Sequence, residues 1–288
     1  MTVFTSLHWR SADGLALHAR DYPGSADYAP VVCIHGLTRN ARDFEDLAPA
    51  IVAATGRRVI AVDVRGRGAS ERSPDPMTYN PGMYAGDIMA LLDDQAISSA
   101  AFIGTSMGGL IMMTLALMRP GAIAAAVLND VGPEIAPEGL ARIAGYVGVS
   151  ADVADWAGAA AYVKAGNGAV FPSYDDSDWD RMARRTFREE GGRPVLDYDP
   201  DIAVPIRAAD PSAPPPDLWP VFGALAAGRP ALLIRGATSD ILSAGIAARM
   251  RAAAPHMGYA EVPGVGHAPM LDESEALGAI VALLNGAG

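Results

Sequence analysis

Short apolar runs alternate with longer helix-forming runs along the first half of the chain. The apolar runs have the length of strands and cover residues 31–34, 59–62, 101–103 and 124–128. The helix-forming runs between them cover residues 43–54, 83–92 and 107–118. Because strands that alternate with helices form βαβ units, this pattern predicts a doubly wound, mostly parallel sheet of the α/β class.

The pattern changes between residues 131 and 219, where no obvious buried strand separates the helical stretches. Helices are predicted there at residues 138–146, 153–163 and 178–190. Apolar strands then return at residues 230–234 and 259–262. We therefore expect a core domain of residues 1–130 and 220–288 with a helical cap of residues 131–219 inserted into it. The proline-rich run at residues 210–216 is predicted to be an extended linker back to the core.

A glycine-flanked serine joins the predicted strand at 101–103 to the predicted helix at 107–118. A serine on such a sharp turn needs small residues two positions before it and two after it, because the backbone must close tightly. Gly104 and Gly108 meet this requirement around Ser106. Ser106 is therefore predicted to be a nucleophile held at the tip of the turn.

Two later residues could complete a Ser-His-Asp arrangement. Asp240 follows the predicted strand at 230–234, and His267 follows the predicted strand at 259–262. Because the carboxyl ends of parallel strands meet at one edge of a sheet, side chains from these loops can converge there. The order serine, acid, histidine leads us to expect Asp240 as the acid and His267 as the base. Asp130, at the end of the strand before the predicted cap, is the alternative acid.

The chain carries several motifs in order: His35-Gly36, Asp63-x-Arg65-Gly66-x-Gly68-x-Ser70, the Ser106 turn, Asp240 and Gly266-His267. Together they resemble the α/β-hydrolase family, in its capped single-domain branch, over nearly the whole chain. The resemblance implies the α/β-hydrolase fold with an inserted helical cap. It also implies an oxyanion hole made by the backbone N–H groups of Leu37 and Met107, with His35 and Gly36 shaping the loop.

Composition restricts the partners of the protein. The 288 residues carry a net charge of −11 and no run rich in Lys or Arg, which disfavours nucleic acid and anionic membranes. The single cysteine, Cys33, allows no internal disulfide, and no Cys/His cluster has zinc spacing, so we expect neither a metal nor a cofactor. Residues 1–10 contain no apolar run of signal-peptide length. We expect a cytoplasmic monomer or homodimer that acts on a small molecule.

The predicted chemistry is acyl transfer to water. In this hypothesis His267 takes the proton of Ser106, and Asp240 holds the imidazole in the required tautomer. Apolar surroundings at Met107, Met112 and Met113 favour a neutral, apolar acyl ester as the substrate. The function expected first is therefore that of a carboxylic ester hydrolase for small to medium acyl groups.

Two other functions remain open within the same resemblance, because a fold does not choose among chemistries. Arg39 and Arg42 could bind a substrate carboxylate, which keeps a carbon-carbon bond hydrolase or a lactonase as alternatives. A non-catalytic receptor that only binds a small ligand is the alternative from another class. Haloalkane dehalogenases and epoxide hydrolases are disfavoured, because Ser106 cannot form their alkyl ester on an aspartate.

Overall fold

An eight-stranded sheet forms the centre of the computed structural model, which describes residues 4–210 and 216–287. In chain order its strands are β1 (Thr5–Arg10), β2 (Ala16–Tyr22), β3 (Val31–Ile34), β4 (Val59–Asp63), β5 (Ala100–Thr105), β6 (Ile123–Asn129), β9 (Ala231–Gly236) and β10 (Gly258–Val262). In space they are ordered β1-β2-β4-β3-β5-β6-β9-β10. Only the pairs β1–β2 and β2–β4 are antiparallel. The predicted mostly parallel sheet is confirmed.

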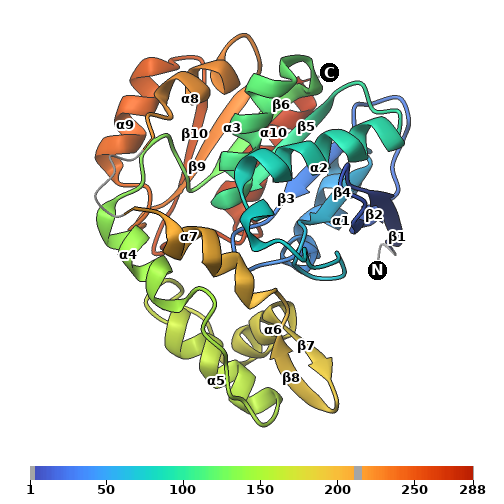
Figure 1. The fold of residues 1–288 in the computed structure, drawn as a ribbon. Coiled ribbons are helices and arrows are strands. Elements are labelled where there is room, and N and C mark those ends of the chain that lie inside the picture. The colour runs from blue at the N-terminus through green and yellow to red at the C-terminus, as the bar shows by residue number, and fades with distance from the viewer. Residues whose placement is uncertain (1–3, 211–215, 288) are drawn as a thin grey trace.

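Helices cover both faces of this sheet (Figure 1). One face carries α2 (Pro81–Asp94), α3 (Met107–Met118), α8 (Trp219–Ala226) and α9 (Ala244–Ala253), and the other carries α1 (Leu47–Thr55) and α10 (Ser274–Gly286). The strands explain why both faces are covered. In β3, Val32 and Ile34 join the core cluster of the first face, while Val31 and Cys33 join that of the second. Side chains alternate along a strand, so a fully apolar strand needs partners on both sides.

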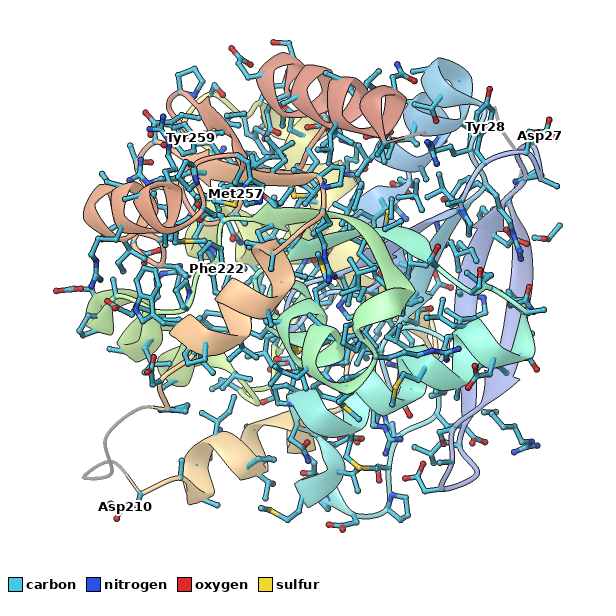
Figure 2. The ribbon with its side chains drawn as sticks, turned by 90° about the horizontal axis from the view of Figure 1, so that it is seen from above. Asp27, Tyr28, Asp210, Phe222, Met257 and Tyr259 are labelled. Atoms are coloured by element: carbon cyan, nitrogen blue, oxygen red, sulfur yellow. The ribbon has the colours of Figure 1, made fainter. Side chains whose placement is uncertain are left out.

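Seen from above, α8 packs over the sheet with Phe222 directed into the interior (Figure 2). Phe222 and Met257, which precedes β10, belong to the same buried cluster. The helix α8 also contacts α3. The chain has therefore returned to the core layer by residue 219.

Between β6 and α8 lies a separate lobe, called here the inserted segment (residues 137–208), which sits beyond one end of the sheet (Figure 1). It contains α4 (Pro137–Tyr146), α5 (Trp156–Asn167), α6 (Asp176–Thr186), β7 (Phe187–Glu190), β8 (Arg193–Leu196) and α7 (Val204–Ala208). Short 3-10 helices occur here and in the core at η1 (Ala41–Phe44), η2 (Pro76–Thr78), η3 (Pro120–Ala122) and η4 (Pro200–Ala203).

The antiparallel hairpin β7–β8 contradicts the prediction of a helix over residues 178–190. The helix α6 ends at Thr186 because Gly191 and Gly192 adopt φ angles of 58° and 79°, which close a hairpin turn. Five residues of the predicted linker, 211–215, lie outside the described residues.

Candidate active site

Ser106 lies on the turn between β5 and α3, as predicted. Its φ of 52° and ψ of −114° are rare for a residue with a side chain, and its amide donates to the Asn129 carbonyl at 3.0 Å. The flanking glycines are required by close contacts. A Cβ on Gly104 would lie 2.5 Å from the carbonyl carbon of Gly108, and a Cβ on Gly108 would lie 2.2 Å from the Ile34 carbonyl oxygen.

His267 joins Ser106 to a buried carboxylate. Its Nε2 lies 2.9 Å from Ser106 Oγ, and its Nδ1 lies 2.8 Å from Asp130 Oδ2. Asp130 is fully buried and also accepts from the Gly236 amide at 2.9 Å and from the Ser239 hydroxyl at 2.6 Å. The three side chains thus form one hydrogen-bonded chain from serine to histidine to aspartate.

The expectation that Asp240 is the partner of His267 is wrong. Asp240 receives two hydrogen bonds from Arg142 of α4, from Nε at 2.5 Å and from Nη2 at 2.8 Å. These bonds hold the pKa of the Asp240 carboxyl below its usual value. The strands β6 and β9 are neighbours, so the loops that carry Asp130 and Asp240 both reach this edge of the sheet. The backbone of Asp130 is left-handed, with a φ of 56°, and its carboxylate bonds to His267.

Next to Ser106 lie the two amides that the family resemblance assigns to an oxyanion hole. Leu37 lies in the loop after β3 and lines the same cavity as Ser106, and Met107 is the first residue of α3. Within the described part of the chain, neither amide donates a hydrogen bond to another protein atom. The first amides of a helix are free donors by geometry, and the positive end of the helix dipole adds to their attraction for an anion.

His35 supports this loop from behind. Its Nε2 accepts from the Val64 amide at 3.1 Å, so its Nδ1 is the donor to the Gly36 carbonyl oxygen at 2.7 Å. Complete burial lowers the pKa of His35 to about 4. The residue is therefore a neutral imidazole that links the loop after β3 to the loop after β4.

A cavity of about 470 Å³ opens above Ser106 and His267. The core contributes one wall, and the inserted segment contributes the other, with Tyr146, Met182 and Tyr198 among its residues. Its aromatic lining residues are Phe44, Tyr146, Tyr162, Phe171 and Tyr198. The cavity is thus lined by both parts of the chain.

Two expectations about the surroundings of the site are wrong. The methionines Met107, Met112 and Met113 are buried in the core cluster and do not line the cavity, whose own methionines are Met182 and Met270.

Arg42, considered above as a carboxylate ligand, also does not line the cavity. It joins Asp197 at 2.5 Å and the Phe187 carbonyl at 3.1 Å, and so links η1 to the inserted segment. Arg39 does line the cavity, but all three guanidinium nitrogens are used. They bond to Asp43 and to the hydroxyl of Thr186. Neither of the two expected arginines is therefore left without a protein partner.

In the ranges 4–210 and 216–287, no helix combines the length and the apolar character needed to cross a bilayer. No group of three or more His, Cys, Asp or Glu side chains converges as metal ligands in the same ranges.

Comparisons with known proteins agree with this geometry. The sequence model of a family described as "Alpha/beta hydrolase family" matches residues 31–280. The chain is 36% identical over 246 residues to the 3-hydroxybutyrate-oligomer hydrolase of Cupriavidus necator. This match covers 83% of this chain and 82% of that protein. A shorter match, 41% identical over 112 residues, relates it to the sn-1-specific diacylglycerol lipase ABHD11 of Xenopus tropicalis, with 39% of this chain and 34% of that one covered.

Among solved structures, an alpha/beta hydrolase from Novosphingobium aromaticivorans is similar with a TM-score of 0.91 at 48% identity. The match covers 99% of both chains. The predicted α/β-hydrolase fold is confirmed.

Proposed function

This chain belongs to the alpha/beta hydrolase family, and we propose that it hydrolyses carboxylic esters through an acyl-enzyme on Ser106. In this proposal His267 accepts the serine proton through Nε2, and Asp130 holds Nδ1 protonated and stabilises the imidazolium that forms. The amides of Leu37 and Met107 bind the oxyanion of the tetrahedral intermediate.

The second half of the reaction uses the same groups. The histidine returns its proton to the leaving alcohol, and a water molecule then attacks the acyl-enzyme with His267 again acting as the base. The inserted segment, together with its connections from residue 131 to 219, serves as a cap that closes the cavity over Ser106. Closing the cavity limits the access of bulk water, which strengthens the electrostatic interactions inside it.

One observation carries the proposal. The hydrogen-bonded chain of Ser106, His267 and Asp130 ends at a cavity of about 470 Å³, beside two amides that have no other acceptor among the described residues. A purely structural role requires neither a strained serine nor free donors next to it. The names of two relatives support the ester as the bond that is cleaved, since one acts on 3-hydroxybutyrate oligomers and the other is a diacylglycerol lipase.

A labelling experiment tests the nucleophile. The purified protein is incubated with a fluorophosphonate probe, and the modified peptide is located by mass spectrometry. We expect the adduct on Ser106 and none in the Ser106→Ala variant. Turnover of 4-nitrophenyl acetate, butyrate and octanoate then measures the acyl length that the cavity accepts, and Ser106→Ala should lose roughly four orders of magnitude in kcat.

The outcomes separate the candidate functions. Labelling at Ser106 with turnover supports an ester hydrolase. Labelling without turnover of any simple ester contradicts the ester as the substrate and directs the search to lactones and carbon-carbon bonds. A protein that is neither labelled nor active but is stabilised by small ligands would be a receptor on the same fold.

A further inference from the structure

We propose that Arg142 recognises a carboxylate on the substrate, so that the preferred substrates are esters that carry one free carboxylate. This inference rests on the proposed ester hydrolysis and adds the class of molecule that enters the cavity.

The residues that line the cavity include three charged ones, Arg39, Asp43 and Arg142. Arg39 is neutralised by Asp43 through Nε and Nη2, and its Nη1 donates to Thr186. Within the described residues, Arg142 uses only Nε and Nη2, both toward Asp240. Its Nη1 and the second N–H of Nη2 form a free edge of the guanidinium plane. This edge has the geometry that binds a carboxylate through two parallel hydrogen bonds.

The ion pair is oriented so that its cation faces the cavity. Arg142 belongs to the cavity lining, whereas Asp240 does not. Each side chain is 35% exposed, so the guanidinium can be reached from the cavity while it is bound to Asp240. Asp240 occupies the edge formed by Nε and Nη2, so a second carboxylate can bind the other edge without displacing it.

The helix that carries Arg142 is held in place by contacts other than the ion pair. The Ala136 amide, just before α4, donates to the Ile241 carbonyl at 3.0 Å. One turn before Arg142, Gly139 approaches the same loop so closely that a Cβ would lie 2.5 Å from the Asp240 carbonyl oxygen. Because this backbone contact docks α4 on the β9–α9 loop, the arginine side chain is free to adjust to a ligand.

Asp240 then has a second role, different from the acid role expected from the sequence. It is bound to one edge of the guanidinium and leaves the other edge open. It also reduces the net positive charge that a substrate carboxylate experiences. Removing Asp240 should therefore strengthen the attraction of Arg142 for an anionic substrate, while removing Arg142 should abolish it.

A matched pair of substrates tests this inference: 4-nitrophenyl hydrogen adipate, which has a free carboxylate, and methyl 4-nitrophenyl adipate, which has the same chain without the charge. We expect wild-type kcat/KM to favour the acid. Arg142→Gln should lower kcat/KM for the acid by about 10- to 100-fold, the usual range for a lost charge-assisted hydrogen bond. The same variant should change the methyl ester less than about threefold.

Two further variants separate recognition from a structural role. Asp240→Asn should raise kcat/KM for the acid several-fold, mainly through a lower KM, and leave the methyl ester unchanged. Arg249→Gln breaks another ion pair of the connecting region, with Glu134, outside the cavity lining, and it should affect both esters equally. Recognition predicts that Arg142→Gln and Asp240→Asn change kcat/KM for the acid in opposite directions. An ion pair that only held α4 against the β9–α9 loop would make both variants lower it.

The inference is overturned if Arg142→Gln slows both esters to the same extent, or if Asp240→Asn also weakens cleavage of the acid. In either case turnover of the methyl ester by the wild type leaves the proposed ester hydrolysis intact. Cleavage of neither ester, with no labelling of Ser106, contradicts the proposed function itself and removes the basis of this inference.

Discussion

Asp130 accepts three hydrogen bonds in a fully buried position, from His267, Ser239 and the Gly236 amide. Both oxygens of this buried carboxylate therefore accept at least one hydrogen bond, which offsets the cost of removing them from water. Asp240 is partly exposed and bonds to Arg142 instead. The two residues are chemically identical, and their surroundings give them different tasks.

Asp130→Asn should lower kcat about 10⁴-fold on a neutral ester such as 4-nitrophenyl butyrate. An amide at this position donates to Nδ1 of His267 and so forces the proton onto Nε2, which can then no longer accept the proton of Ser106. Asp240→Asn is the matched control and should keep kcat within about threefold of the wild type. If kcat fell more in Asp240→Asn than in Asp130→Asn, Asp240 would be the acid that supports His267.

His35 makes stability depend on pH. Burial lowers its pKa from 6.5 to about 4, so between these values the unfolded chain binds a proton that the folded chain excludes. The stabilising contribution is complete above pH 6.5 and is lost as the pH falls toward 4, by at most about 3 kcal/mol.

His35→Gln removes the pH-dependent contribution of His35 to the free energy of unfolding. Its free energy of unfolding should therefore fall less than that of the wild type between pH 7.5 and pH 4.5, by about 2–3 kcal/mol. Urea denaturation at both values measures the difference. Parallel losses in the two proteins would contradict a neutral, buried His35.

At the scale of the elements, the position of α3 against β3 decides the geometry of the site. The helix begins with Met107 directly after Ser106, and Gly108 allows its first turn to lie against the Ile34 carbonyl. One close contact therefore places both the serine and one of the amides assigned to the oxyanion hole.

Gly108→Ala should lower kcat by about 100-fold or more, because the new Cβ would lie 2.2 Å from the Ile34 carbonyl oxygen and must displace the turn. Gly278→Ala on α10 is the control, since nothing lies within 4 Å of its Cβ position. It should leave kcat unchanged and raise stability by up to about 1 kcal/mol. Circular dichroism checks that both variants are folded, and normal kcat in folded Gly108→Ala would contradict the role of this contact.

At the scale of the whole molecule, the inserted segment docks on the loop that follows the proposed oxyanion loop. Arg185, at the end of α6 and 3% exposed, bonds to Glu45 at 2.9 Å and to Asp46 at 2.5 Å. Asn40 donates to the Arg185 carbonyl at 2.9 Å. The wall of the cavity and the loop beside Ser106 are thus joined, so loosening one should disturb the other.

Arg185→Met should lower the free energy of unfolding by about 1–3 kcal/mol, because the charge-assisted hydrogen bonds of a buried guanidinium to Glu45 and Asp46 are lost. The inserted segment should also become more sensitive to limited proteolysis than the core. Arg181→Met, on the same helix, removes only an exposed pair with Asp178 and should cost less than about 1 kcal/mol. Equal protease sensitivity of both variants would show that Arg185 does not hold the segment.

Local patterns in the sequence were enough to predict the sheet, the two layers of helices and the turn that carries Ser106. Apolar periodicity and the need for Gly104 and Gly108 are short-range properties, because they depend on neighbouring residues and on steric limits of the backbone. The start of β7 was missed for a related reason. Residues 187–190 continue a helix-like pattern, and only the turn at Gly191 and Gly192 allows them to pair as a strand with β8.

The choice between Asp130 and Asp240 was decided only by the tertiary structure. Both residues follow buried strands, and β6 and β9 are neighbours in the sheet, so both carboxylates reach the same edge. Which of them meets His267 depends on the left-handed backbone of Asp130 and on Arg142, which arrives from a distant helix to bind Asp240. Contacts between segments about 100 residues apart leave no local pattern in the sequence. The lining of the cavity and the free edge of Arg142 depend on such contacts, so they too could not be predicted from the sequence.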